Sequence, residues 1–247
     1  MVDGQEVNQS ARPAGRIWLD VPYGGKDEAK ALGAMWDPNA RSWYQPQRDA
    51  PGLDRWARLP DIPAVLAGED RTFGSGLFVD LVPSTCWFSN VRSCVVQRDW
   101  ERLRRMVLAR AGLVCEACGR CENSQTRRWL EVHERWDYTT DGHTYHQQLR
   151  RLICLCTDCH QTTHFGYATV KGCDREALDH LCAVTGMTHQ QALEHVEAAY
   201  TTWEMHSAFD WTLDLTILTN AGLTLTNPPA AADRPHLASQ QLRVLGG

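Results

Sequence analysis

Alternating hydrophobic and polar positions in residues 16–22 predict a short strand near the start of the chain. Residues 26–33 have the spacing of a short helix that ends at Gly33. An Asp-Pro-Asn turn between two aromatic stretches in residues 34–44 is typical of a hairpin. These elements predict a small α/β module. Its minimal core is expected to come from three tryptophans, of which one ring could remain exposed and stack on a base: Trp18, Trp36 and Trp43.

The pattern changes after this module. Residues 61–96 are expected to form a linker that contains one short apolar strand at residues 77–83. In residues 97–110 the apolar positions recur with a helical period, which predicts an amphipathic helix with a basic polar face.

The C-terminal part is expected to be mainly helical. The apolar spacing predicts a helix over residues 174–184. Thr188 can cap the next helix, and Gln191 at its third position completes a capping box. Residues 211–218 alternate and predict a strand, and the composition after residue 226 predicts a loose tail.

The composition is that of a soluble globular protein, with 43% hydrophobic residues in a chain of 247. No apolar run approaches the roughly 20 residues of a membrane-spanning helix, and no secretory signal begins at Met1. A cytoplasmic location is therefore expected. Ten cysteines in such a chain indicate reduced thiols and metal ligation, not disulfides.

Charge is unevenly distributed around a net value of −5. Arginines are concentrated in residues 92–151, whereas acidic residues dominate residues 174–247. The basic segment is where a phosphate backbone is expected to bind. Alternatively, these arginines form ion pairs with the acidic C-terminal region, which could itself dock a protein partner. The candidate nucleic-acid contacts are Arg98, Arg102, Arg105, Arg150 and Arg151.

Two Cys-x-x-Cys pairs carry the most specific chemistry in the sequence. A tetrahedral zinc ion takes four thiolate or imidazole ligands, which two such turns supply. Gly119 follows the first pair and tolerates the positive φ with which a zinc knuckle turns its amides toward sulfur. Cys121 and Cys154 offer rival pairings, but the matching two-residue spacers favour one set of ligands: Cys115, Cys118, Cys156 and Cys159.

Three histidines form a second candidate centre. His160 and His164 are four residues apart, so they share one face of a helix expected over residues 159–166 and ended by Gly166. His133 follows an apolar run that predicts a strand. Two imidazoles and a strand-end ligand can hold a divalent ion against a phosphate, an arrangement suited to phosphodiester hydrolysis.

The N-terminal segment, from residue 16 to about residue 60, contains Val-Pro-Tyr, then Lys-Asp-Glu-Ala-Lys-Ala-Leu-Gly-Ala-Met-Trp-Asp, then Trp-Tyr. This pattern resembles the small domain of unknown function that is attached to plasmid primases and TraC-like proteins. The resemblance implies a nucleic-acid context, without a mechanism.

Residues 97–170 resemble the HNH endonuclease family. Leu155-Cys156-Thr-Asp-Cys159-His160 matches the Leu-Cys-x-x-Cys-His element at the start of the family's metal helix, and Leu130-Glu131-Val132-His133-Glu134 matches its first strand. The resemblance implies a ββα-metal fold stapled by structural Zn²⁺. It also implies a catalytic divalent ion, such as Mg²⁺ or Mn²⁺, whose ligands would be His133, His160 and His164.

Two positions depart from the family's pattern. In the favoured register, Glu134 occupies the general-base position, and the catalytic residues are His133, Glu134 and His160. A glutamate base needs a pKa raised toward neutrality; a register shifted by one makes His133 the base. Arg151 stands where an asparagine usually orients the loop. Two histidines in the loop between the strands are the lower-ranked alternatives for the base: His143 and His146.

The expected fold is α+β: a small N-terminal α/β module, a zinc-stapled ββα-metal (HNH) core and a C-terminal helical extension. The expected function is a metal-dependent DNA endonuclease or nickase, acting on double-stranded or nicked DNA in phage defence, restriction or a mobile element. The alternatives are a zinc-dependent nucleic-acid-binding module that has lost the chemistry, and an adaptor that docks a partner enzyme. The expected domains are a disordered tail (1–15), the module (16–60), a linker and strand (61–96), the zinc domain (97–172), the extension (173–226) and a flexible tail (227–247).

Overall fold

The computed structural model confirms a mixed α+β architecture and describes residues 16–38, 40, 42–46, 51–59, 61–87 and 89–226. The chain divides into two units, Met1–Pro60 and Asp61–Gly247, called the small and the large unit below. The tails predicted over residues 1–15 and 227–247 lie outside the described residues.

The small unit is built on an antiparallel sheet with the strand order β1-β3-β2. Its core differs from the predicted one. Trp56 lies in this core, whereas Trp36 is 46% exposed and packs edge-on against Trp43. Gly33 has a φ of +91° just after α1, which explains why the helix ends there. The elements are β1 (Ile17–Leu19), η1 (Tyr23–Gly25), α1 (Lys26–Ala31), β2 (Met35–Asp37), β3 (Ser42–Gln45) and η2 (Asp54–Trp56).

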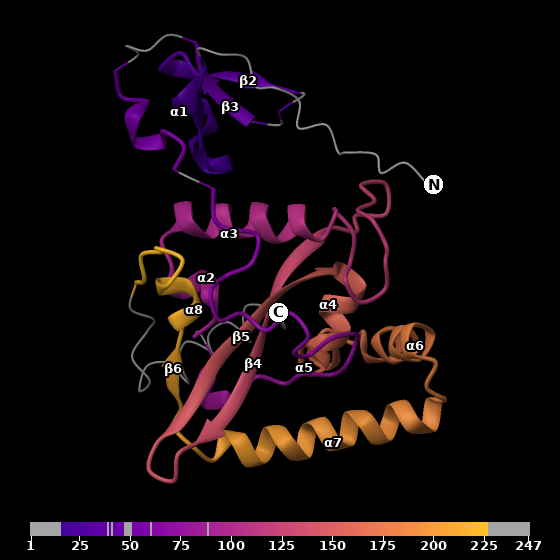
Figure 1. Cartoon of the computed structure of the whole chain (residues 1–247). Helices are drawn as coiled ribbons and strands as arrows, with labels where there is room; N and C mark the ends of the chain where they lie inside the picture. The colour runs from indigo at the N-terminus through magenta and orange to yellow at the C-terminus, as the bar shows by residue number, and fades with distance from the viewer. Residues whose placement is uncertain are drawn as a thin grey trace, which may run out of the picture. The chain divides into compact units, whose positions relative to one another are not determined.

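The large unit is organised by a long antiparallel hairpin, β4 (Leu130–Thr140) and β5 (Tyr145–Cys156), to which β6 (Thr212–Asp214) adds in parallel beside β5. Figure 1 shows α7 beside the tip of this hairpin and α3 near its other end. The helices are η3 (Ser84–Cys86), α2 (Val91–Cys94), α3 (Gln97–Arg110), α4 (Thr157–Thr163), α5 (Phe165–Val170), α6 (Asp174–Thr185), α7 (His189–Ser207) and α8 (Thr216–Thr219).

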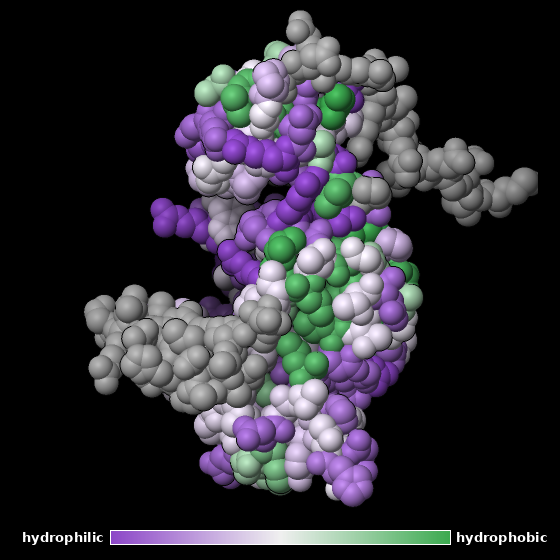
Figure 2. All heavy atoms as spheres, turned by 90° about the vertical axis from the view of Figure 1, so that its left-hand side faces the viewer, coloured by the Kyte–Doolittle hydropathy of each residue, from purple (hydrophilic) through white to green (hydrophobic). Residues whose placement is uncertain are grey.

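Burial explains why this hairpin is central. The last part of β5, from Leu152 to Cys156, is buried at every position, so this stretch is covered on both faces. The helix α3 packs its buried side chains Leu103 and Val107 into the same hydrophobic cluster. Apolar surface also remains outside: Figure 2 shows a band of apolar residues between hydrophilic ones on one face of the large unit.

Several local predictions hold. The helix α3 has the predicted bounds, 97–110. The capping box of α7 is present, since the Thr188 side chain accepts from the amide of Gln191 and the Gln191 side chain accepts from the amide of Thr188. These features depend on side chains that are close together in the sequence, so the sequence alone was sufficient to predict them.

Three predicted elements are wrong. Residues 77–83 form no strand, because the amides of Val79 and Asp80 donate to His195 Nε2 and to the Thr163 carbonyl, at 3.0 and 2.9 Å. The strand predicted at 211–218 stops at Asp214, whose Oδ1 accepts from the Thr216 amide at the start of α8.

The helix predicted over residues 159–166 is the third error. It begins earlier, at Thr157, and ends at Thr163. His164 leaves the helical conformation with φ −88° and ψ 51°, and Gly166 lies inside the next helix, α5. The expected loop between the two core strands is short, since β4 reaches Thr140 and β5 begins at Tyr145.

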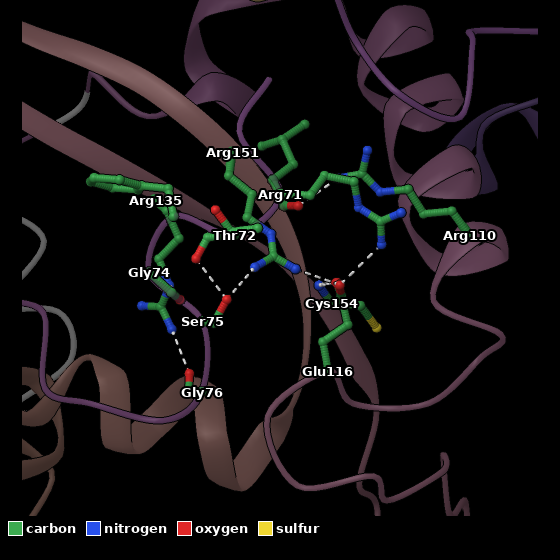
Figure 3. Close-up of polar contacts among 12 residues, drawn as sticks. Arg71, Thr72, Gly74, Ser75, Gly76, Arg110, Glu116, Arg135, Arg151 and Cys154 are labelled. Carbon is green, nitrogen blue, oxygen red and sulfur yellow. Dashed lines mark hydrogen bonds and ion pairs between the residues drawn. The ribbon is translucent and has the colours of Figure 1, made fainter. Parts of the chain in front are cut away.

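Arginines of the hairpin and of α3 hold the preceding loop in place. Figure 3 shows Arg151 between Ser75 and Glu116, and Arg135 reaching the carbonyl of Gly76. Arg135 is fully buried on β4 and also lies 3.6 Å from Asp80. Here the arginines pair with nearby acidic groups in and before the hairpin.

Arg110 and Glu69 form the most deeply buried of these pairs. Both nitrogens of the Arg110 fork lie 2.6 Å from the Glu69 carboxylate, and the side chains are 3% and 0% exposed. Arg110 also donates to the carbonyl of Leu152 at 2.5 Å, and Glu69 accepts from the amide of the same residue at 3.1 Å. The pair therefore fastens the linker to β5 and α3.

We expect Glu69→Ala to lower the unfolding free energy of the large unit by about 3–5 kcal/mol, because the charge of Arg110 would stay buried without its partner. Urea unfolding of the full chain measures this change. The matched control is Glu101→Ala on α3, where the glutamate accepts from Gln97 at the surface and the expected change is within about 0.5 kcal/mol. Equal effects of the two substitutions would contradict the assignment.

The same pair gives a pH dependence. Burial alone would raise the pKa of Glu69, but hydrogen bonds from Arg110 and the Leu152 amide outweigh it, and the pKa lies below its ordinary 4.5. A carboxyl with a lowered pKa stabilises the fold above its unfolded pKa and loses this contribution as the pH falls through its folded pKa. Below pH 4.5 the wild type should therefore lose unfolding free energy more steeply than Glu69→Ala in urea titrations; parallel curves would argue against it.

Candidate metal centres and the adjoining cleft

Four cysteines of the large unit come together at the base of the hairpin. Their sulfur atoms all lie within 4.8 Å of one another, and the Cys118 and Cys156 sulfurs are 3.6 Å apart. The turn of the first pair is closed by Gly119, which has a φ of +73° and donates its amide to the Cys115 carbonyl at 2.8 Å. The cluster contains the four predicted residues: Cys115, Cys118, Cys156 and Cys159.

The cysteine thiols of the cluster shift one another's pKa values. Hydrogen bonds from Cys156 and Cys159 hold the pKa of Cys115 well below its ordinary value. The same contacts raise the pKa of Cys159, and raise that of Cys156 to about 12. Four thiolates this close together repel one another, so they require a positive ion between them.

The rival cysteines lie outside this cluster. Cys121 is exposed, and burial raises the pKa of the Cys154 thiol to about 12. The backbone of Cys154 has a structural role instead, because its amide donates to Glu116 Oε2 at 2.7 Å and its carbonyl accepts from the Glu116 amide at 2.8 Å. Glu116, inside the first Cys-x-x-Cys turn, thus fastens that turn to β5.

Arg151, a predicted nucleic-acid contact, is paired inside the protein. Its guanidinium donates to Glu116 Oε1 at 2.6 Å, and its side chain is 6% exposed. A buried fork that already holds a carboxylate is not available to a phosphate. Arg151 instead connects the turn of the first cysteine pair to the hairpin.

His180 was not predicted as part of the cysteine cluster. Its Nε2 lies 3.2 Å from the sulfur of Cys159, at the point where α6 packs against α4. An imidazole N–H in this position can donate to a thiolate and orient it. The sequence spacing gave no signal of this contact, since only the packing of α6 brings the two residues together.

The three predicted histidines also come together, beside the cysteine cluster. His133 lies on β4, His160 in α4, and His164 at the end of that helix. The ring centroid of His133 is 5.3 Å from that of His160 and 4.8 Å from that of His164, and one nitrogen of each ring lies within 4.8 Å of the others. The β4–β5 pairing places His133 opposite Ile153, three residues before Cys156 and α4.

Both ring nitrogens of His133 are buried and have no hydrogen-bond partner. An unsatisfied buried pair of this kind is costly without a ligand. Burial lowers the pKa of all three rings, that of His133 well below its ordinary value and that of His164 to about 3. Burial thus favours the neutral form of the rings, one nitrogen of each lies within 4.8 Å of the others, and His160 Nδ1 lies 3.3 Å from Glu131 Oε2.

Glu134 does not join the histidines. Neighbouring residues of a strand point to opposite faces, and Glu134 Oε1 accepts from the amide of Val91 at 2.9 Å. Burial raises the pKa of this carboxyl to about 7. The structure thus places His133, and not Glu134, in the histidine cluster, and the adjacent Glu134 has a pKa near neutrality.

A cleft of about 1210 Å³ joins these groups along β4, the edge strand of the sheet. His133, His160 and His164 line it, and so does Glu134. The rival bases lie elsewhere: His143 is in the hairpin turn, and His146, on β5, lies 3.5 Å from Asp141.

The arginines that line the cleft are Arg92 and Arg104, which were not among the predicted contacts. The predicted Arg98, Arg102 and Arg105 are outside its lining, and Arg102 is 10% exposed and bonded to Asp99. Arg150 pairs with Asp137 at 2.8 Å. Helical periodicity gave the apolar face of α3 correctly, but it could not show which of the polar positions the fold would leave open.

Comparison with known proteins identifies only the small unit. Residues 16–58 match the family model described as "Domain of unknown function (DUF5710)". DNA primase TraC of Escherichia coli is 44% identical over 64 residues, which are 26% of this chain and 4% of the primase; a second DNA primase TraC of Escherichia coli is 53% identical over 47 residues, which are 19% and 4%. The chain thus covers about 4% of the length of these relatives.

These matches confirm the predicted TraC-like segment. No solved structure matches the chain, so the resemblance of residues 97–170 to HNH endonucleases stays a prediction. Among the described residues, every helix is too short or too polar to cross a lipid bilayer.

Proposed function

We propose that the large unit is a metal-dependent DNA endonuclease or nickase of the HNH type, with residues 97–172 as its zinc-stapled ββα-metal core. The observation that carries this proposal is the three-histidine cluster beside a cleft, in which both buried ring nitrogens of His133 lack hydrogen-bond partners. A binding protein without chemistry has no physical need for three converging neutral imidazoles.

The cysteine cluster fits structural zinc. Four sulfurs within 4.8 Å of one another give the closed, all-thiolate ligand set of a structural site, with no position left for substrate. The hydrogen-bonding environment that Glu116 and His180 provide is the kind that orients ligands around such an ion.

The histidine cluster fits a second divalent ion, with His133, His160 and His164 as its ligands. Bound there, such an ion would polarise a phosphodiester and stabilise the charge that develops on its oxygens. Glu134 would accept the proton of the attacking water, because its carboxyl titrates near neutrality in the same cleft. Arg92 and Arg104 would hold the flanking phosphates.

DNA is the proposed substrate for two reasons. The cleft combines cationic side chains with the histidine cluster, and the small unit is similar to a segment of a DNA primase. The second candidate, a nucleic-acid-binding module without catalysis, is favoured by one observation: Glu134 is engaged by the Val91 amide on the other face of β4.

We expect one zinc ion per chain, and we expect Cys118→Ser to lose it and to unfold the core. Structural zinc contributes on the order of 10 kcal/mol to the folding of small zinc domains. Elemental analysis of the purified full chain and urea unfolding measure the two effects. Cys121→Ser is the matched control, because this exposed cysteine lies outside the cluster. A wild-type protein without zinc would refute the assignment.

We expect the wild type to nick supercoiled plasmid with Mg²⁺ or Mn²⁺, and His133→Ala to abolish nicking while zinc content and DNA binding are retained. The reason is that the histidine and cysteine clusters use different ligands. Gel electrophoresis of the plasmid gives the rate, and His146→Ala, outside the cleft lining, serves as control. Failure to nick with any divalent ion, with DNA binding intact, would favour the binding module.

Glu134→Gln tests the proposed base separately. The substitution keeps the side-chain oxygen that accepts from Val91 but removes the proton acceptor, and general-base catalysis contributes about 10²–10⁴-fold. We expect a decrease of that size in the nicking rate, with zinc content unchanged. An unaltered rate would assign the base role to another group.

A further inference from the structure

Two aromatic rings are exposed on the lining of the cleft. Trp129 is 48% exposed and Tyr167 is 45% exposed, which is unusual for side chains of this size. Trp129 precedes β4, and Tyr167 lies in α5, one turn after His164. The two rings therefore come from the same two parts of the chain that supply the histidine cluster.

The backbone holds both residues firmly. The Trp129 amide donates to Thr157 Oγ1, and the Thr157 amide donates to the Trp129 carbonyl, each at 3.0 Å. The Tyr167 amide donates to the His164 carbonyl at 2.8 Å. The backbone of each residue is thus fixed to the start or the end of α4, the helix that carries His160, so both rings project from positions next to the histidine cluster.

Further aromatic side chains extend this lining. The indoles of Trp87 and Trp203 both donate to the carbonyl of Val82, at 3.1 and 3.0 Å, which fixes their orientation. Trp100 and Trp136 also line the cleft and are mostly buried. The cleft is consequently lined by several aromatic side chains, of which Trp129 and Tyr167 are exposed.

The charged side chains of the lining are compatible with a polyanion. Arg92 and Arg104 supply the cations. Of the two lining carboxylates, Glu131 lies 3.3 Å from His160 Nδ1, and Glu134 accepts from the Val91 amide. The acidic groups are therefore engaged by partners within the protein.

Exposed aromatic rings distinguish between forms of DNA. In a duplex each base stacks on its neighbours and presents only its edge, so a protein ring finds no base face to contact. In an unpaired segment the base faces are free, and stacking on aromatic side chains beside a cationic groove is the general mode of binding single strands.

We propose that this cleft binds an unpaired DNA segment, with bases stacked on Trp129 and Tyr167 and phosphates held by Arg92 and Arg104. This inference rests on the proposed nuclease function and deepens it: the preferred substrate is a single strand, or a duplex that is locally opened, at the histidine cluster.

The test is equilibrium binding of the zinc-loaded full chain without added divalent ion, so that cleavage does not enter. Fluorescence anisotropy compares a labelled strand of about 15 nucleotides with the duplex of the same sequence. We expect tighter binding to the strand, and a loss of roughly 5- to 150-fold in strand affinity for Trp129→Ala or Tyr167→Ala, the range that one stacked base provides. Trp129→Phe, which keeps a ring, should retain most of the affinity.

Phe209→Ala is the matched control, because this ring is also exposed but lies outside the cleft lining, and strand binding should not change. Equal affinity for strand and duplex, or a strand preference that survives both cleft substitutions, would overturn the inference. If strand binding depends on the two rings but neither the plasmid nor the single strand is cut with Mg²⁺ or Mn²⁺, the nuclease proposal fails and the strand site stands. If DNA is cut but strand binding does not depend on the two rings, the nuclease proposal stands and the strand site is refuted.

Discussion

The pairing register of β4 with β5 is the constraint on which the rest of the large unit depends. It places Leu130 opposite Cys156 and His133 opposite Ile153, so the start of α4 carries Cys159 and His160 to the correct side of β4. A slip of one residue would turn His133 to the face that Glu134 now occupies. The register is held by burial on both faces of β5 and by the pairs that Glu116 and Glu69 make with arginines.

Residues close together in the sequence were predictable. The cysteine pairs, the histidines at positions 160 and 164, the bounds of α3 and the capping box of α7 all depend on spacing within a few residues. The apolar run before His133 correctly indicated a strand, although β4 continues to Thr140. Local chemistry therefore gave the members of both clusters and most of the helices.

The errors concern contacts between distant parts of the chain. Arg151 lies in a basic segment and was predicted to contact phosphate, but its guanidinium donates to the carboxylate of Glu116, 35 residues away. Arg104 lines the cleft because the fold leaves its side of α3 open, and His180 reaches Cys159 because α6 packs on α4. Tertiary packing determines these contacts, so neither the number of arginines in a segment nor the alternation of apolar residues can predict them.

The position of β4 at the edge of its sheet has a consequence for association between chains. An edge strand has unpaired backbone groups on one side, and a second chain can add there and start aggregation. This edge adjoins the cleft, so covering it would restrict access to the histidines. One feature of the strand opposes such pairing while leaving the edge open: the irregularity between Arg135 and Trp136, which interrupts a flat ladder. A local change in the pairing of β4 thus protects against self-association without closing the cleft.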